Sequence, residues 1–359
     1  MGEGSGETAG RTAGPGQGPG GAPAAIALSP ILSARYRARD LERIREAAPG
    51  SRIVTISVEG LSDESLADVE VLLRGPLSPD AFDRILARAP RLAWVHSASA
   101  GVERVLTPSS RERGIVITNA RGVFSRPIAE YVMMMILSVS RRLPQLLELQ
   151  RERTWQPLEG AELRDITIGI VGLGSLGRAI GALASAFGCR VVATRRRFEV
   201  GVEQVGDDHD PTAEVHHLMV DQILSPDRLP ELLAESDFVV LAAPLTPETE
   251  SMINAETLAQ FKPGAWLINV ARGRLVDERA LLRALREGQL GGAVLDTFRE
   301  EPLPPSSPFY DLPNVIVTPH TSWSSARVLD RSVDLFCENL RRYAEGRTLV
   351  NVVDPDAGY

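Results

Sequence analysis

The sequence predicts an α/β protein built from two parallel-sheet domains. The main observation is the segment 166–177, in which an apolar, β-branched strand runs into Gly-x-Gly-x-x-Gly and then into a helix. Strand-like and helix-like stretches alternate on both sides of this segment, which is typical of parallel strands joined by helices. A length of 359 residues is sufficient for two domains, each with its own hydrophobic core.

The three glycines of the motif have separate expected roles in a β-α-β unit. Gly172 makes the tight turn, Gly174 lets the backbone approach a pyrophosphate, and Gly177 lets the helix pack closely on the strand. The free N–H groups at the start of the helix can then hold phosphate groups. The position of the motif between a strand and a helix favours dinucleotide binding over a purely structural turn.

Composition argues against several classes of protein. The hydrophobic fraction of 43% and the charged fraction of 24% are those of a soluble globular protein, and the net charge of −8 argues against nucleic acid as a partner. The most apolar run, 131–139, is too short to cross a membrane. Two cysteines are too few for a disulfide framework and lack metal-site spacing, so a cytoplasmic setting is expected. Residues 1–24 are rich in Gly and Pro, which predicts a disordered tail.

From Ala25 the alternation predicts the first, smaller domain. Strands are expected at 25–29, 53–58, 69–74, 92–97 and 114–118, and helices at 39–47 and 79–89. The segment 94–102 is a strand ending in small residues, which suits a nest of backbone N–H groups for a carboxylate and equally an ordinary tight turn. His96 within it is expected to be a packed histidine at the end of the strand.

A long apolar helix follows the first domain. Ser125 is placed to cap it, Pro127 suits its first turn, and it should run through Leu137. Because it is apolar nearly all round, it should be buried between layers or against a second subunit. A polar helical continuation is expected at 146–153.

After the glycine motif the same alternation continues. Strands are expected at 238–243, 265–270, 292–295 and 315–317, and helices at 226–235, 255–261, 278–287 and 325–344. The last helix should pack back on the first domain. The segment 200–222 has no clear period, and its histidines, His209, His216 and His217, have no ordered ligand set beside them. A surface loop is expected there, and no metal site is predicted.

Polar residues at the carboxyl ends of the later strands are the candidates for chemistry, because ligands of open parallel sheets bind at those ends. They are Arg272, the segment 296–301 and His320. Arginine can bind a carboxylate with two hydrogen bonds and polarise an adjacent carbonyl. Histidine can exchange a proton near neutral pH, and a carboxylate beside it favours its charged form.

Five segments together make the chain similar to a known family. They are 172–177, the Pro-Leu-Thr-Pro-Glu-Thr of 244–249, the Asn-Val-Ala-Arg-Gly of 269–273, the Leu-Asp-Thr-Phe-Arg-Glu-Glu-Pro of 295–302, and the Thr-Pro-His of 318–320. In this order they resemble the D-isomer-specific 2-hydroxyacid dehydrogenases, in particular their glyoxylate and hydroxypyruvate reductases. The resemblance covers about residues 25–353.

The resemblance implies roles and an architecture. It implies Arg272, Glu301 and His320 as the catalytic residues and Asp296 near the nicotinamide amide. It implies that the backbone of Ala100, Gly101 and Val102 binds the substrate carboxylate, with Arg272 also at the substrate. Trp323, three residues after His320, is expected to wall the substrate pocket, and packing at the start of the last helix is the alternative. It also implies a Rossmann-like cofactor domain, 127–323, inserted into a flavodoxin-like substrate domain, 25–126 and 324–359, and a homodimer formed through the cofactor domains.

The expected cofactor is NADP(H), with NAD(H) as the alternative. The strand after the glycine helix ends in Thr194 and then Arg195 and Arg196, where an NAD-binding fingerprint normally has a carboxylate on the ribose. A guanidinium at this position suits a 2′-phosphate, although the arginines also fit a solvated turn. The full set expected at the cofactor is Gly172, Gly174, Ser175, Leu176, Gly177, Arg195, Arg196, Ala243, Pro244, Thr249, Val270, Ala271, Asp296 and Thr321.

The favoured function is reduction of a small 2-keto acid such as glyoxylate or hydroxypyruvate, with hydride transfer from the nicotinamide and His320 as general acid and base. Two alternatives stay open. One is a phosphoglycerate dehydrogenase-type enzyme, which often has an additional regulatory domain. The other is a dinucleotide-sensing interaction protein of the C-terminal binding protein type, which keeps the same three catalytic residues.

Overall fold

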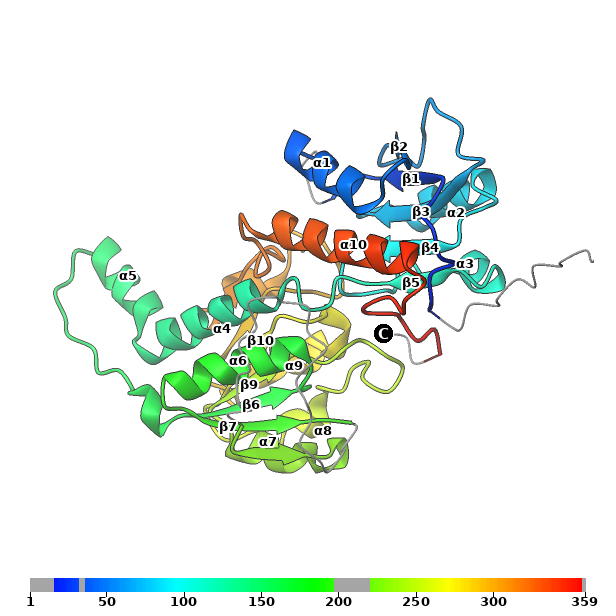
Figure 1. Ribbon diagram of the computed structural model, residues 1–359. Coiled ribbons are helices and arrows are strands. Elements are labelled where there is room, and N and C mark those ends of the chain that lie inside the picture. The colour runs from blue at the N-terminus through cyan, green and yellow to red at the C-terminus, as the bar shows by residue number, and fades with distance from the viewer. Residues whose placement is uncertain (1–15, 32–35, 197–219, 357–359) are drawn as a thin grey trace, which may run out of the picture. The chain divides into compact units, whose positions relative to one another are not determined.

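The chain divides into two compact units, each built around one parallel sheet. The computed structural model describes residues 16–31, 36–196 and 220–356 (Figure 1). The first unit joins residues 1–120 to 329–359, and the second consists of residues 121–328. The boundaries expected after 126 and 323 stay predictions. The segment with His209, His216 and His217 lies outside the described residues.

The first unit contains a five-stranded parallel sheet with the order β2-β1-β3-β4-β5. This is the order 2-1-3-4-5 of flavodoxin-like folds. Its strands are β1 (Ala25–Leu28), β2 (Arg52–Thr55), β3 (Val69–Arg74), β4 (Trp94–Ser97) and β5 (Val116–Thr118). Its helices are α1 (Ala38–Ala47), α2 (Pro79–Arg88), α3 (Pro108–Glu112), which the sequence did not predict, and α10 (Val328–Ala344).

Helix α10 completes the core of this unit, as expected. The buried indole of Trp94 in β4 lies 5.5 Å from the ring of Phe336 and 5.6 Å from that of Tyr343, both in α10. His96 lies on the same strand and is fully buried, and burial lowers its pKa to about 3. Its Nδ1 lies 2.7 Å from the Thr118 hydroxyl. His96 is therefore a neutral packed residue, which confirms the prediction.

The predicted disordered tail, 1–24, lies partly within the described residues. From Gly16 onward the chain is paired with the segment that follows α10: the Gly18 N–H donates to the Arg347 carbonyl, and the Gly16 carbonyl accepts from the Leu349 N–H at 3.0 Å. Gln17 and Thr348 form an antiparallel bridge. The prediction was wrong for residues 16–24 because these tertiary hydrogen bonds are not visible in a Gly-rich composition.

The second unit contains a seven-stranded parallel sheet with the order β12-β11-β10-β9-β6-β7-β8. Read from the first strand, β6, this is the order of a dinucleotide-binding fold, which confirms the predicted α/β class. Its strands are β6 (Thr167–Val171), β7 (Arg190–Thr194), β8 (Gln222–Leu224), β9 (Phe238–Leu241), β10 (Trp266–Asn269), β11 (Gly292–Leu295) and β12 (Val315–Val317). The sequence did not predict β8.

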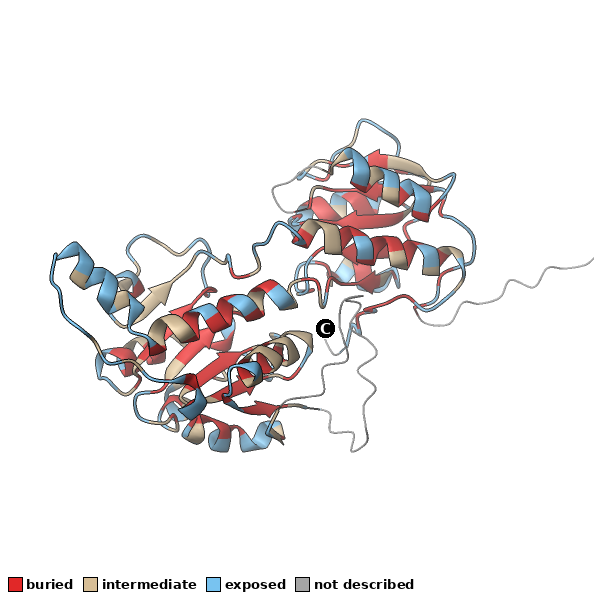
Figure 2. Cartoon of the chain, turned by 60° about the vertical axis from the view of Figure 1, so that its left-hand side comes forward, coloured by how far each residue is buried: buried red, intermediate tan, exposed pale blue. Residues whose placement is uncertain are grey.

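Helices cover both faces of this sheet and bury its apolar strands (Figure 2). One face packs on α4 (Ser125–Ser140) and α6 (Ser175–Ala186), and the other on α7 (Leu229–Glu235), α8 (Ala255–Leu258) and α9 (Glu278–Arg286). The 3-10 turns are η1 (Leu163–Asp165), η2 (Pro226–Arg228), η3 (Gly273–Leu275) and η4 (Pro308–Asp311). Because the strands are parallel, all their carboxyl ends lie at one edge of the sheet.

Two details of the α4 region differ from expectation. Ser125 is the first residue of α4 and not its cap, because Phe124 takes the cap position and no side chain caps the helix. The polar continuation is a separate helix, α5 (Leu143–Arg151). The break occurs at Arg142, whose φ of 58° is left-handed, and Pro144 lies in the first turn of α5.

Candidate active site

The loops at the carboxyl edge of the second sheet carry most of the residues predicted to be functional. The glycine motif follows β6, the arginine pair follows β7, and Arg272 follows β10. Asp296 follows β11, and His320 follows β12. The order of the sheet reverses between β6 and β9, and this switch point is where parallel sheets of this kind bind ligands.

Two of the glycines in the motif are required by close backbone approach. Gly172 has a φ of 102°, and a Cβ there would lie 2.8 Å from the Ala243 backbone. A Cβ on Gly177 would lie only 2.2 Å from the Gly172 carbonyl oxygen. The loop is also held from β7, because the hydroxyl of Thr194 accepts the Gly172 N–H at 3.2 Å. Thr194 was missed in the sequence because its role depends on the pairing of β6 with β7.

Gly174 differs, since a Cβ there would meet no atom within 4 Å. It is the N-cap of the 12-residue helix α6. The N–H groups of Gly174, Ser175, Leu176 and Gly177 donate to no acceptor among the described residues. Four free donors at a helix start, beside open space, form a site for an anion. These residues therefore fit the diphosphate of a dinucleotide.

The arginine pair lies where the end of β7 meets the end of β8. The Arg195 backbone N–H donates to the Leu224 carbonyl at 2.9 Å, and its side chain is half-buried, while Arg196 is exposed. The hydrogen bond of the Glu248 carboxylate with Thr246 lowers the pKa of Glu248, and the charge of Arg196 lowers it further. No carboxylate of this chain follows β7 before the described residues end at Arg196.

The loop after β9 is organised by one hydroxyl. Thr249 Oγ1 accepts the Thr246 N–H at 2.8 Å and donates to the Pro244 carbonyl at 2.8 Å. This role holds the predicted cofactor residues Ala243 and Pro244 in a fixed turn. The direct contact predicted between Thr249 and a cofactor stays a prediction.

Arg272 lies in a tightly specified turn after β10. The side chain of Asn269 accepts the Ala271 N–H at 3.1 Å and donates to the Arg272 carbonyl at 3.0 Å. A Cβ on Gly273 would lie 1.9 Å from the Phe298 carbonyl carbon. The turn that carries Arg272 therefore packs directly on the turn that leads to Glu301. The predicted cofactor residues Val270 and Ala271 are buried within it.

Glu301 and His320 form the most direct contact of the candidate site. Glu301 Oε2 lies 2.8 Å from His320 Nδ1, and Glu301 Oε1 accepts the Phe298 N–H at 3.0 Å. Partial burial alone would raise the pKa of Glu301. The hydrogen bonds from His320 and Phe298, with the charges of His320 and Arg272, outweigh burial and lower it. The structure thus brings Glu301 into contact with His320 and within the electrostatic reach of Arg272.

His320 lies in a constrained turn. Its φ is 48°, in the left-handed region, and its N–H donates to the Thr318 carbonyl at 3.0 Å. The indole Nε1 of Trp323 donates to the His320 carbonyl at 2.7 Å. The Trp323 ring meets the ring of Phe124 edge to face, with centroids 6.4 Å apart. Trp323, predicted at the substrate, is thus tied to the backbone of His320.

Asp296 fixes the turn that carries His320 through hydrogen bonds. It is fully buried, and its carboxylate accepts the Thr318 hydroxyl at 2.6 Å, the Thr321 N–H at 2.9 Å and the Ser322 N–H at 3.0 Å. The sequence identified Asp296 as a site residue but not this role, since the three donors come from a loop after another strand. The Thr321 N–H, also in the predicted cofactor set, is used by the same carboxylate.

The predicted carboxylate nest lies in the first unit, after β4. The N–H groups of Ala100, Gly101 and Val102 donate to no acceptor among the described residues. Their carbonyls are fixed: that of Ala100 accepts from Asn119 Nδ2, and that of Gly101 accepts from the Ser99 hydroxyl, both at 2.9 Å. Three free consecutive donors on a fixed loop favour the nest over an ordinary turn.

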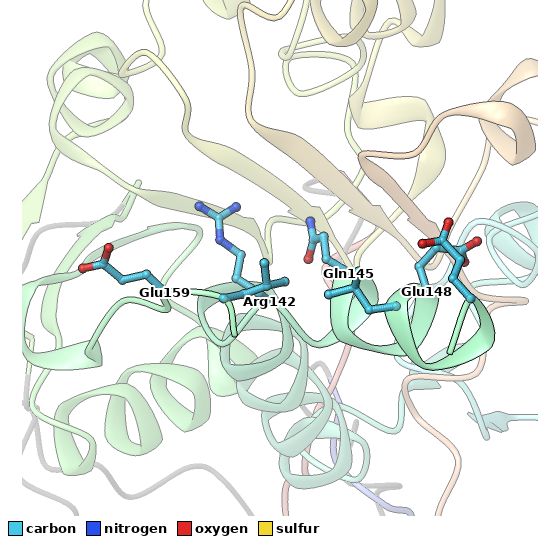
Figure 3. Close-up of a pocket in the computed structure, with 7 residues that line it drawn as sticks. Arg142, Gln145, Glu148 and Glu159 are labelled. Atoms are coloured by element: carbon cyan, nitrogen blue, oxygen red, sulfur yellow. The ribbon is translucent and has the colours of Figure 1, made fainter. Parts of the chain in front are cut away.

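A hollow of about 490 Å³ lies elsewhere in the second unit, between α5 and the loop that follows it (Figure 3). It is lined by Arg142, Gln145, Glu148, Leu149, Glu152, Leu158 and Glu159. None of these belongs to the predicted site. Within the described part of the chain, no three His, Cys, Asp or Glu side chains are grouped to hold a metal, and no helix has the length and apolarity of a membrane span.

Comparison with known proteins identifies the family. Residues 133–322 match the model of the D-isomer specific 2-hydroxyacid dehydrogenase NAD-binding domain. The chain is 31% identical to a glyoxylate reductase from Korarchaeum cryptofilum, over 88% of this chain and 90% of that protein. It also matches mycobacterial D-3-phosphoglycerate dehydrogenases at 34% identity, but spans only 57% of their length.

Solved structures agree with this result. A D-isomer specific 2-hydroxyacid dehydrogenase from Xanthobacter autotrophicus, in complex with NADPH and MES, superposes with a TM-score of 0.78 at 31% identity, over 94% of this chain and 100% of that one. An NADPH-dependent glyoxylate/hydroxypyruvate reductase from Sinorhizobium meliloti, in complex with NADP and sulfate, superposes with a TM-score of 0.75 at 28% identity, over 93% of this chain and 99% of that one. The chain belongs to the D-isomer specific 2-hydroxyacid dehydrogenase family and is an NAD(P)-dependent oxidoreductase acting on CH–OH donors.

Proposed function

We propose that this enzyme reduces a small 2-keto acid, such as glyoxylate or hydroxypyruvate, with NADP(H) as its preferred cofactor. The observation that carries the proposal is the 2.8 Å contact between His320 Nδ1 and Glu301 Oε2 at the carboxyl edge of the cofactor-binding sheet. It provides an imidazole with one nitrogen held by a carboxylate, while the other, Nε2, has no partner among the described residues and can exchange a proton with a substrate.

Each residue of the trio has a distinct task in this proposal. When bound, the nicotinamide cofactor supplies the hydride that adds to the carbonyl carbon. His320 Nε2 donates a proton to the carbonyl oxygen, and it takes that proton back in the oxidative direction. Arg272 binds the substrate carboxylate and polarises the carbonyl. Glu301, kept ionised by its lowered pKa, gives the ring of His320 a charged partner and fixes its orientation.

The substrate carboxylate is proposed to bind the loop of the first unit as well. The free N–H groups of Ala100, Gly101 and Val102 support this role, because three backbone donors can surround a carboxylate without a charged side chain. Trp323, fixed by its hydrogen bond to the His320 carbonyl, is proposed to bound the space beside the carbonyl group. Domain 25–126 with 324–359 is thus the proposed substrate domain, and 127–323 the proposed cofactor domain.

The preference for NADP(H) is supported by the residues after β7. Arg195 and Arg196 follow the strand where an NAD-binding fold of this type has a carboxylate for the ribose hydroxyls. A guanidinium can form two hydrogen bonds with a phosphate. The S. meliloti reductase is described as NADPH-dependent and holds NADP, and the Xanthobacter structure holds NADPH.

A homodimer through the cofactor domain is proposed on the exposure of α5. None of its nine residues is buried within the single chain, and Leu143, Leu146 and Leu147 are all exposed. Trp155, in the loop after α5, is fully exposed. Such a surface is covered in a dimer formed by a second copy of the chain. Light scattering after gel filtration tests this: a monomer at micromolar concentration contradicts it.

A cytoplasmic location is proposed from the cysteines. Cys189 and Cys337 are both buried free thiols, and burial raises the pKa of each. Free thiols persist in reducing compartments. Cell fractionation followed by immunoblotting tests the proposal, and recovery outside the cytoplasmic fraction contradicts it.

The test of the proposed function is a substrate panel. Oxidation of NADPH and of NADH is measured with glyoxylate, hydroxypyruvate, phosphohydroxypyruvate, pyruvate, phenylpyruvate and branched 2-keto acids. Turnover of one or two small acids, faster with NADPH, is the expected result. Tight NADPH binding without turnover of any acid would instead favour the dinucleotide-sensing alternative, and turnover of phosphohydroxypyruvate alone would favour the phosphoglycerate dehydrogenase alternative.

A further inference from the structure

A chain of hydrogen bonds leads from the middle of α4 to the turn that carries His320. The hydroxyl of Tyr131 in α4 lies 2.6 Å from the hydroxyl of Thr318, two residues before His320. Thr318 in turn donates to Asp296 Oδ1 at 2.6 Å. Tyr131 and Thr318 are 187 residues apart in the sequence, and neither is among the residues predicted to act at the site.

The chemistry of the three groups sets the direction of this chain. A carboxylate oxygen only accepts, so Thr318 uses its single hydroxyl proton on Asp296. Thr318 must then accept from Tyr131, whose phenol is the donor. Burial raises the pKa of Tyr131 to about 12, with the nearby Asp296 adding to the rise, so the phenol keeps its proton at any working pH. The two hydrogen bonds therefore point the same way: Tyr131 donates to Thr318, and Thr318 donates to Asp296.

The same carboxylate fixes the backbone on the other side of His320. Asp296 accepts the N–H groups of Thr321 and Ser322, at 2.9 and 3.0 Å. Asp296 thus binds the turn before and after His320. The residue between these anchors has a φ of 48°, which costs free energy for a residue other than glycine and persists only where the surroundings impose it.

We propose that Tyr131 is a positioning residue of this enzyme, which acts through Thr318 and Asp296 to hold His320 in its left-handed turn with Nδ1 on Glu301. The inference rests on the proposed function, because it takes His320 as the acid and base. Tyr131 itself touches neither His320 nor Glu301 through any hydrogen bond in the described structure. Its hydroxyl adds an anchor on α4, a helix buried against α6, so the turn is tied to the rigid core of the unit.

The experiment compares hydroxyl deletions with a matched conservative variant. Tyr131→Phe removes the phenol, Thr318→Val removes the middle hydroxyl at constant shape, and Thr318→Ser keeps that hydroxyl. Tyr310→Phe, at an exposed tyrosine of η4, is the control for the chemical change. For each variant, kcat and KM for the best 2-keto acid, the Kd for NADPH by fluorescence titration, and Tm are measured. His320→Ala is included in the same series.

The expected result is a loss in kcat with binding preserved. A misplaced general acid lowers kcat by about tenfold in Thr318→Val and about fivefold in Tyr131→Phe, while KM and the Kd for NADPH stay within about twofold. Thr318→Ser and Tyr310→Phe should keep the wild-type kcat. In the double variant Tyr131→Phe with Thr318→Val, the loss should equal that of Thr318→Val alone, because both changes break one chain of bonds.

Two results would overturn the proposal in distinguishable ways. If His320→Ala abolishes turnover while Tyr131→Phe and Thr318→Val lower only Tm, the hydroxyls are merely structural, and the positioning role alone is rejected. The same holds if the two losses in kcat multiply in the double variant. If His320→Ala keeps the wild-type rate, His320 is not the acid and base, and both the proposed function of the trio and this inference are rejected.

Discussion

His320 Nδ1 lies 2.8 Å from Glu301 Oε2, and the two residues come from the loops after adjacent parallel strands. The pKa of Glu301 is lowered because hydrogen bonds from His320 and Phe298 outweigh partial burial. A lowered pKa means that the carboxylate remains ionised as the pH falls, until the pH passes below the ordinary range of a glutamate. Across neutral pH the imidazole therefore always faces a negative charge.

Removal of that charge should change how the rate depends on pH. Glu301→Gln keeps the shape of the side chain but gives the protonated imidazole no charged partner. We expect kcat for keto acid reduction to fall about tenfold to a hundredfold, and the decline on the basic side of the pH profile to move to lower pH. The matched control is Glu300→Gln at the exposed neighbouring glutamate, which should behave as wild type. An unchanged profile in Glu301→Gln contradicts the assignment.

Charge reversal after β7 should alter cofactor choice. Arg195→Asp replaces the guanidinium proposed to bind the 2′-phosphate by a carboxylate that repels a 2′-phosphate and can accept hydrogen bonds from ribose hydroxyls. We expect kcat/KM for NADPH to fall at least about tenfold while that for NADH is kept or rises. Arg164→Asp, at an exposed arginine of η1, controls for net charge. A wild-type enzyme that prefers NADH, or equal losses for both cofactors in Arg195→Asp, would contradict the prediction.

Substitutions at the glycines of α6 and its N-cap should distinguish effects on stability from effects on cofactor binding. A Cβ at Gly174 lies in open space, so Gly174→Ala should leave Tm unchanged but intrude on the diphosphate, weakening NADPH binding by about tenfold. Gly177→Ala should lower both Tm and the affinity for NADPH, because its Cβ would lie 2.2 Å from the Gly172 carbonyl oxygen. Gly181→Ala is the control, since its Cβ makes only ordinary contacts, the nearest at 3.5 Å. Thermal unfolding with and without NADPH measures both effects, and unaltered NADPH affinity in Gly174→Ala rejects the assignment.

The first unit should lose stability in acid through Asp40. This carboxylate has a fully buried side chain, and burial alone would raise its pKa, but its hydrogen bonds with Arg37, at 2.7 and 2.9 Å to the guanidinium and 2.9 Å to the N–H, lower it. Because the folded-state pKa lies below the unfolded value, the stabilisation is present above the unfolded pKa and is lost as the pH falls through the folded pKa.

Asp40→Asn therefore lowers the free energy of unfolding near neutral pH by about 2 kcal/mol, and the difference from wild type should shrink in acid. Urea unfolding at several pH values measures it. Glu42→Gln, at an exposed position of α1, should have little effect. A difference between Asp40→Asn and wild type that does not vary with pH would show that Asp40 contributes through shape and not through charge.

Periodicity and motif spacing are sufficient to predict the elements that position the site. The strands β3, β11 and β12 occur at the predicted residues, because buried strands of parallel sheets are short apolar runs bounded by turn residues. The contact of Glu301 with His320 agrees with the expectation from the motifs at 295–302 and 318–320. The rule that ligands bind at the carboxyl ends of strands also selects the segment 296–301, which begins with Asp296.

What the sequence could not supply depends on contacts between distant segments. In the sequence, Tyr131 is one more apolar position of a buried helix. The role of its hydroxyl depends on the hydrogen bond with Thr318, which the sequence does not reveal. The left-handed φ of His320 has no sequence signal, because a histidine in that region is imposed by its surroundings. The pairing of Gly16 with Leu349 joins opposite ends of the chain and is equally invisible in composition.

The central claim is that His320 exchanges the proton in a reaction whose cofactor is held by the glycine motif. Its most direct test is the rate of NADPH oxidation with glyoxylate and with hydroxypyruvate, measured for wild type and for His320→Ala, together with the Kd for NADPH of both proteins. The account predicts that His320→Ala binds NADPH within about twofold of wild type and loses at least about a hundredfold in kcat. A variant that turns over either acid at the wild-type rate would contradict it.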